Sequence, residues 1–120
     1  MLVGGMVLVG PASAGQTMES YGPYDVYAIG NWISSSTDQF KVLGKVEETN
    51  GNYVGLNLKL EVSNTRLPFG PWYTSTSSNW QVSTGWKTYQ DTQYRRDHDV
   101  KTTFSSSTGH SGDAVYTLDA

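Results

Sequence analysis

The sequence predicts an all-β domain, an antiparallel β-sandwich or small barrel of roughly five to seven strands. Three observations lead to this fold class. Apolar and polar residues alternate along several segments, which is typical of strands with one buried and one solvated face. Stretches rich in Gly, Pro, Asn and Ser separate these segments, and no stretch keeps the apolar spacing of a long helix.

The composition limits both the fold and the partners. With 120 residues the chain has room for one domain, and 37% hydrophobic and 12% aromatic residues are too many for a disordered chain. A net charge of -3 provides no basic surface for phosphate groups, so we expect no nucleic-acid partner. The chain has no cysteine, which excludes disulfide bonds, a thiolate nucleophile and a cysteine-ligated zinc site, and we expect no cofactor.

The N-terminus combines an uncharged apolar run with a small-residue motif, Ala12-Ser13-Ala14. An apolar run of roughly 7 to 15 residues that ends in Ala-x-Ala is typical of a secretory signal peptide and its cleavage site. We therefore expect residues 1–14 to be the remnant of a signal peptide, residues 15–120 to form a single β domain, and the protein to be secreted. Because no basic residue precedes the run, the alternative is a core or edge strand that uses Val3, Val7 and Val9.

The clearest strand covers residues 54–62, where every second residue is apolar. A second alternating segment begins at Phe40, and the turn signal Asn50-Gly51 lies between the two, so we predict a hairpin over residues 40–62. A three-residue loop, with Gly51 in the left-handed conformation, brings the apolar residues of both segments onto one face. A two-residue loop would place them on opposite faces.

Four further segments have the composition of strands. Residues 25–33 are rich in β-forming residues but apolar on both faces, which suits a strand covered on both sides or one that packs against a partner sheet. The other three keep their apolar residues in one phase and cover residues 80–86, 100–104 and 114–118. Gly85 is a candidate β-bulge in the first of these three.

Aromatic side chains gather between residues 72 and 89, among Ser, Thr, Asn and Gln. Flat aromatic faces stack on sugar rings while hydroxyl and amide groups bind sugar hydroxyls, so this composition suits a glycan site. The Pro and Gly residues of segment 68–71 predict a loop at residues 72 and 73, where exposed aromatic residues are often binding residues. Core packing is the alternative for Trp80 and Trp86, which share a phase with Val82. The candidate ligand-binding residues are Trp72, Tyr73, Trp86 and Tyr89.

Two polar clusters are weaker candidates for a functional site. Within residues 94–99, an extended backbone would point His98 away from Asp97 and Asp99, so a solvated strand entry with weak ion pairs is favoured. In a loop the two carboxylates could hold calcium, but the sequence shows no further oxygen ligands for it. Residues 108–113 contain His, Ser and Asp, but adjacent side chains diverge, so an ordinary hairpin loop is favoured. We predict no catalytic and no metal-ligating residue.

Three classes of function remain. The first, which we expect, is a secreted, non-enzymatic recognition module that binds a cell-surface glycan or protein through the aromatic loop. The second is a self-associating structural or toxin-like protein that inserts amphipathic hairpins into a membrane, which the Ser/Thr-rich alternation of residues 74–88 and 100–108 favours. The third is a small secreted hydrolase or an enzyme inhibitor. It has the least support, because the chain has only two histidines and no triad spacing.

Overall fold

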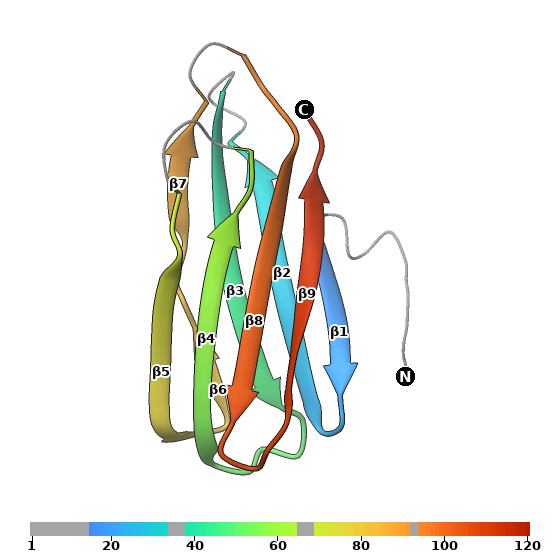
Figure 1. Cartoon of the computed structure of the whole chain (residues 1–120), viewed down its shortest axis with the longest axis vertical. Helices are drawn as coiled ribbons and strands as arrows, with labels where there is room; N and C mark the ends of the chain where they lie inside the picture. Colours follow the sequence, from blue (N-terminus) through green and yellow to red (C-terminus); the bar gives the residue numbers. More distant parts are fainter. Residues whose placement is uncertain (1–14, 34–37, 65–68, 92–93) are drawn as a thin grey trace.

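The computed structural model describes residues 15–33, 38–64, 69–91 and 94–120. Within these residues nine β-strands form two antiparallel sheets that face each other, and no residue is helical (Figure 1). The fold is therefore a β-sandwich, so the predicted all-β class is confirmed, but the described residues form nine strands and not five to seven. The predicted signal peptide remnant covers residues 1–14, which lie outside the described residues.

The first sheet contains five strands: β1 (Gln16–Tyr21), β2 (Tyr24–Trp32), β3 (Gln39–Glu48), β6 (Gln81–Ser83) and β7 (Lys87–Gln90). β2 lies between β1 and β3. The two short strands β6 and β7 pair with different halves of the other edge of β3. Gly85 lies between these two strands, in the left-handed conformation at φ 72°, and marks the break that divides them.

The second sheet contains four strands in the spatial order β5 (Trp72–Asn79), β4 (Val54–Val62), β8 (His98–Ser106) and β9 (Ser111–Leu118). Every neighbouring pair is antiparallel. A register shift between Val54 and Leu56 interrupts the pairing of β4 with β5 near the end where the chain enters β4. The chain crosses between the sheets after β3, after β5 and after β7.

The core lies between the two sheets and follows the alternation of the sequence. Every second residue of β3 and of β8 is buried, as are Leu56, Leu58 and Leu60 of β4. Removing a large apolar side chain from water stabilises a fold by roughly 1.5–3 kcal/mol, so this interior is the main stabilising contribution. The largest fully buried aromatic residues are Tyr24, Phe40 and Phe104.

The predicted hairpin over residues 40–62 is wrong, although both of its segments are strands. β3 pairs with β2, β6 and β7, whereas β4 pairs with β5 and β8 in the other sheet. The connection crosses from sheet to sheet, and Gly51 within it has the predicted left-handed conformation, with φ 77°. Two apolar faces meet equally well across a sandwich or within one sheet, so alternation could not distinguish the two arrangements.

The loop predicted at Trp72 and Tyr73 is also wrong, because both residues belong to β5. From Thr74 onward this strand has polar side chains on both faces, so it lacks the alternation that reveals a strand. The pattern likewise does not predict β1 or β7. The strand predicted with two apolar faces, β2, is covered on one of them: Val26 is buried, whereas Tyr27 on the outer face is half-buried.

Candidate functional site

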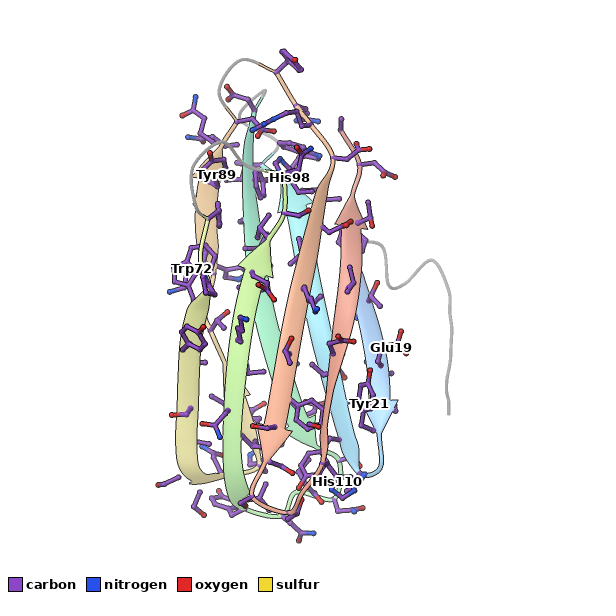
Figure 2. All side chains as sticks on the ribbon, in the orientation of Figure 1. Glu19, Tyr21, Trp72, Tyr89, His98 and His110 are labelled. Atoms are coloured by element: carbon purple, nitrogen blue, oxygen red, sulfur yellow. The ribbon has the colours of Figure 1, made fainter. Side chains whose placement is uncertain are left out.

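Trp72 and Tyr89, two of the predicted ligand-binding residues, point into the sandwich. Both are half-buried, and both pack against the ring of Phe69, with centroid distances of 4.6 Å and 4.4 Å. Tyr89 also meets Phe40 edge-on at 5.5 Å. Figure 2 shows both residues along the β5 and β7 edge of the sandwich, Tyr89 level with His98 and Trp72 nearer the middle. Their rings therefore cover part of this edge of the core.

Tyr73 and Trp86, the other two predicted residues, are exposed on opposite sheets. Tyr73 is 72% exposed on the outer face of the second sheet, where it pairs with Lys59 of β4. A small pocket of about 160 Å³ beside it is lined by Asn57, Leu58, Tyr73, Thr74 and Ser75. Trp86 is 48% exposed, and its ring lies 4.5 Å from Nζ of Lys41 in the first sheet. The four predicted residues thus do not form one binding surface.

A larger pocket is lined by residues at and after the end of β3. This end of β3 lies at the end of the sandwich opposite the start of β8, the strand that begins at His98 (Figure 1). The pocket volume of about 490 Å³ falls within the range of small-ligand sites. Tyr53, which is 67% exposed, and the half-buried Trp80 supply its aromatic walls. We call it the Tyr53–Trp80 pocket, and its described lining residues are Glu47, Glu48, Thr49, Gly51, Tyr53 and Trp80.

Glu48, the last residue of β3, forms hydrogen bonds with the backbone near both aromatic residues of the pocket. Its carboxylate oxygen Oε1 accepts hydrogen bonds from the backbone amides of Asn50 (2.7 Å) and Asn52 (3.0 Å), which fold the loop that leads to Tyr53. Its own backbone amide donates to the carbonyl of Trp80 at 2.7 Å. The two aromatic residues lie 27 positions apart in the sequence, and this one residue fixes the backbone beside both.

The carboxylate of Glu48 is buried and ionised. Hydrogen bonds from the backbone of Asn52 and then of Asn50 lower its pKa, and they outweigh the burial that would raise it. Glu48 is 4% exposed, and no basic side chain among the described residues forms an ion pair with it. The pocket therefore contains a negative charge that backbone amides stabilise and that no cation neutralises.

Glu47, the neighbouring lining residue, lies on the outer face of the first sheet. Its Oε1 accepts a hydrogen bond of 2.9 Å from the hydroxyl of Tyr27, and its Oε2 lies 3.8 Å from Nζ of Lys45. Burial and this hydrogen bond raise the pKa of Tyr27, so its hydroxyl stays protonated and continues to donate. Asp25 of β2 lies directly opposite Glu47 in the register.

Few features of the sequence indicate this pocket. Tyr53 follows the Asn50-Gly51 turn, and an exposed aromatic residue after an acidic pair and a turn was the available signal. Trp80 shares its phase with Val82 and so resembles a core residue, as the sequence analysis proposed. The connection between the sheets, which alternation did not predict, is what brings the two together.

The prediction that residues 94–99 form a solvated strand entry is wrong for His98, which is completely buried together with Asp91. Its Nε2 lies 3.0 Å from Oδ2 of Asp91, and its Nδ1 lies 3.0 Å from the carbonyl oxygen of Ser63. The backbone amide and the guanidinium of Arg96 each donate to Asp91 at 3.0 Å. Both ring nitrogens are engaged away from solvent, so the cluster has a structural role.

The remaining acidic residues of that segment do not form a cation site. Oδ1 of Asp97 accepts the backbone amide of Ala120 at 2.8 Å, and Oδ1 of Asp99 accepts the hydroxyl of Thr117 at 2.7 Å. In the part of the chain that the structure describes, no three His, Asp or Glu side chains are grouped as metal ligands. No helix long and apolar enough to cross a membrane occurs among those residues either.

No protein-family model, curated protein or solved structure matches this chain. The fold defines the class of protein, a β-sandwich domain, and the function must be argued from the pocket itself.

Proposed function

We propose that this protein is a secreted, non-enzymatic recognition module that binds a cell-surface glycan in the Tyr53–Trp80 pocket. The observation that carries the proposal is the pocket itself, about 490 Å³ in volume, with the aromatic residues Tyr53 and Trp80 and the buried carboxylate of Glu48 among its lining residues. Pockets of roughly 300 to 1,000 Å³ with a few convergent polar groups are typical of small-ligand sites. This pocket replaces the single aromatic surface expected from residues 72–89.

The side chains of the pocket suit a sugar. The rings of Tyr53 and Trp80 offer flat apolar faces, and the apolar side of a sugar ring stacks on such faces. Glu48 and the hydroxyl of Thr49 carry oxygen atoms that can accept hydrogen bonds from sugar hydroxyls. Because Glu48 fixes the backbone on both sides, little of the site has to be ordered when the ligand binds.

The protonation state of Glu48 favours a site that binds a sugar over one that hydrolyses it. Hydrolysis requires a carboxylic acid whose pKa is raised so that it can protonate the leaving group. The pKa of Glu48 is instead lowered by backbone hydrogen bonds, so this group accepts hydrogen bonds and does not donate a proton. A module that binds a sugar without cleaving it accords with this chemistry.

The test is a glycan array and a cell-surface binding assay with the full chain and with single alanine variants. We expect the wild-type chain to bind, and both Trp80→Ala and Tyr53→Ala to weaken binding by about tenfold or more, since stacking aromatic residues dominate such sites. Tyr73→Ala is the matched control, because Tyr73 is 72% exposed and Tyr53 is 67% exposed. Absence of binding, or equal binding by Trp80→Ala and Tyr73→Ala, would overturn the proposal.

A further inference from the structure

We propose that two copies of this chain associate through the outer face of the first sheet, on which the outward side chains of β2 and β3 lie. The proposal goes beyond the proposed function, because it does not depend on what the Tyr53–Trp80 pocket binds. It explains why β2 is apolar on both of its faces although only one of them lines the core.

The centre of this outer face is apolar. Ile29 of β2 lies directly opposite Leu43 of β3, and Tyr27, the neighbouring outward residue of β2, lies opposite Met18 of β1. The ring of Trp86, which is 48% exposed, lies on the same face. All nine described strands belong to the two sheets, so no third layer of strands covers this apolar band. Contiguous apolar residues at a surface mark an interaction site.

The outer face of the second sheet has a different character. Its large outward apolar residues, Tyr73 and Val115, lie on the two edge strands, with β4 and β8 between them. The outward residues of its central strand β4 are Asn57, Lys59 and Glu61. This is the polar surface expected where one side of a sheet meets water. The apolar band therefore distinguishes the first sheet from the second.

The charges on the outer face of the first sheet are separated along the strands. Asp25 and Glu47 lie opposite each other near one end of β2 and β3, and Asn31 and Lys41 lie opposite each other near the other end. Lys45 lies 3.8 Å from Glu47, whereas Lys41 forms no ion pair with any described side chain. The face therefore has an acidic end, a basic end and an apolar centre.

A second copy of the same face fits this charge pattern when it is turned end for end. A two-fold axis that lies between the two faces and runs across the strands reverses the order of the outward residues. Lys41 of each copy then faces Glu47 of the other copy, and Tyr27 of each copy faces Ile29 of the other. An arrangement without this reversal would bring the carboxylates of both copies together, which is unfavourable. The face is thus complementary to itself, as the interface of a two-fold dimer requires.

The size and composition of the face also suit a dimer. The molecule measures 44 × 29 × 20 Å, and its sheets lie face-on in the view down the shortest axis (Figure 1). A standard interface buries roughly 800 Å² on each partner, which a face of these two longer dimensions can supply. Aromatic residues and Met are enriched in such interfaces, and this face contributes Met18, Tyr27 and Trp86.

The experiment is analytical ultracentrifugation of the full chain over a range of concentrations. We expect a monomer–dimer equilibrium in the wild-type chain and a monomer in Leu43→Asp, because this change places a charge at the centre of the apolar band. Val115→Asp is the matched control, since Val115 is an outward residue of the other sheet and is 43% exposed. It should dimerise as the wild-type chain does. Circular dichroism would establish that both variants are folded.

Charge reversal tests the end-for-end arrangement. We expect Lys41→Glu and Glu47→Lys each to raise the dissociation constant of the dimer by about tenfold or more, and the double variant to recover most of the loss. The two residues lie six positions apart on one strand, roughly 20 Å, so they cannot pair within one copy. Lys59→Glu on the other sheet is the control and should leave the dissociation constant unchanged.

Several outcomes would overturn the inference. A wild-type chain that stays monomeric at about 100 μM, a dimer that Leu43→Asp leaves intact, or a double variant that recovers nothing would each contradict it. A monomeric chain that binds vesicles of an anionic phospholipid, with binding lost in Leu43→Asp, would replace the second copy by a membrane. Glycan binding is tested separately by Tyr53→Ala and Trp80→Ala, so either proposal can fail while the other holds.

Discussion

The imidazole of His98 lies 3.0 Å from the carboxylate of Asp91 in a completely buried contact that joins β8 to the residue after β7. The ring nitrogens face two acceptors, the carboxylate of Asp91 and the carbonyl of Ser63. The ring also stacks on Phe40 at 4.4 Å. This cluster stabilises the end of the sandwich that lies opposite the Tyr53–Trp80 pocket.

The first prediction concerns the removal of Asp91. Breaking a buried pair leaves its partner charged or unsatisfied inside the protein, which costs about 3–5 kcal/mol. We expect Asp91→Ala to lower the free energy of unfolding by about 3 kcal/mol, measured by urea denaturation. Asp99→Ala, which removes an exposed carboxylate that accepts from Thr117, should cost less than about 1 kcal/mol. Equal effects of the two variants would contradict the structural role of the pair.

The second prediction concerns acid. Burial is the largest single influence on the pKa of Asp91 and would raise it, but hydrogen bonds from His98 and Arg96 together outweigh burial and lower this pKa. Because the folded-state pKa lies below the unfolded value of about 3.9, Asp91 contributes stability above that pH. This contribution is lost as pH falls below about 4 towards the folded-state pKa.

The measurement for this second prediction is the free energy of unfolding as a function of pH. We expect the wild-type protein to lose more stability between about pH 5 and pH 2 than Asp91→Asn, which cannot ionise at that position. Identical acid dependence of the two proteins would show that Asp91 is not linked to folding through protonation.

Alternation along the chain predicted which residues face the core but not which strands pair. His98 is in phase with Val100 and Phe104, so its inward direction could be read from the sequence. Its partner Asp91 lies outside any strand, and a contact of that kind leaves no periodic signal. The pocket could not be predicted for a related reason. Tyr53 and Trp80 lie in connections between the two sheets, and the fold brings these connections together.

The third prediction is a stabilising substitution. The hydroxyl of Thr102 is completely buried and has no hydrogen-bond partner among the described residues. An unsatisfied buried hydroxyl costs about 1–3 kcal/mol, so Thr102→Val, which keeps the shape, should raise the free energy of unfolding by about 1 kcal/mol. Thr103→Val on the outer face of the same strand should bring no such gain. A destabilised Thr102→Val protein would show that the hydroxyl has a partner.

The fourth prediction concerns a close approach of backbone to ring. A Cβ atom at Gly112 would overlap the ring of Tyr21, whose hydroxyl donates to the carbonyl of Asp113 at 2.6 Å. The ring would have to move and give up this hydrogen bond, so Gly112→Ala should destabilise the protein by about 1–3 kcal/mol. Ser111→Ala, at the exposed neighbouring position, is the control and should change stability by less than about 0.5 kcal/mol.

The fifth prediction tests how the pocket is held in place. Glu48→Ala removes the acceptor for the amides of Asn50 and Asn52, so both amides should exchange hydrogen with solvent faster than in the wild-type protein. Glu48→Gln keeps a side-chain oxygen at this position and should retain most of the protection. The backbone amide of Glu48 still donates to Trp80 in both variants, so exchange at Glu48 should change little. Faster exchange in the alanine variant alone would show that the carboxylate orders the loop beside Tyr53, whereas unchanged exchange in both would refute that role.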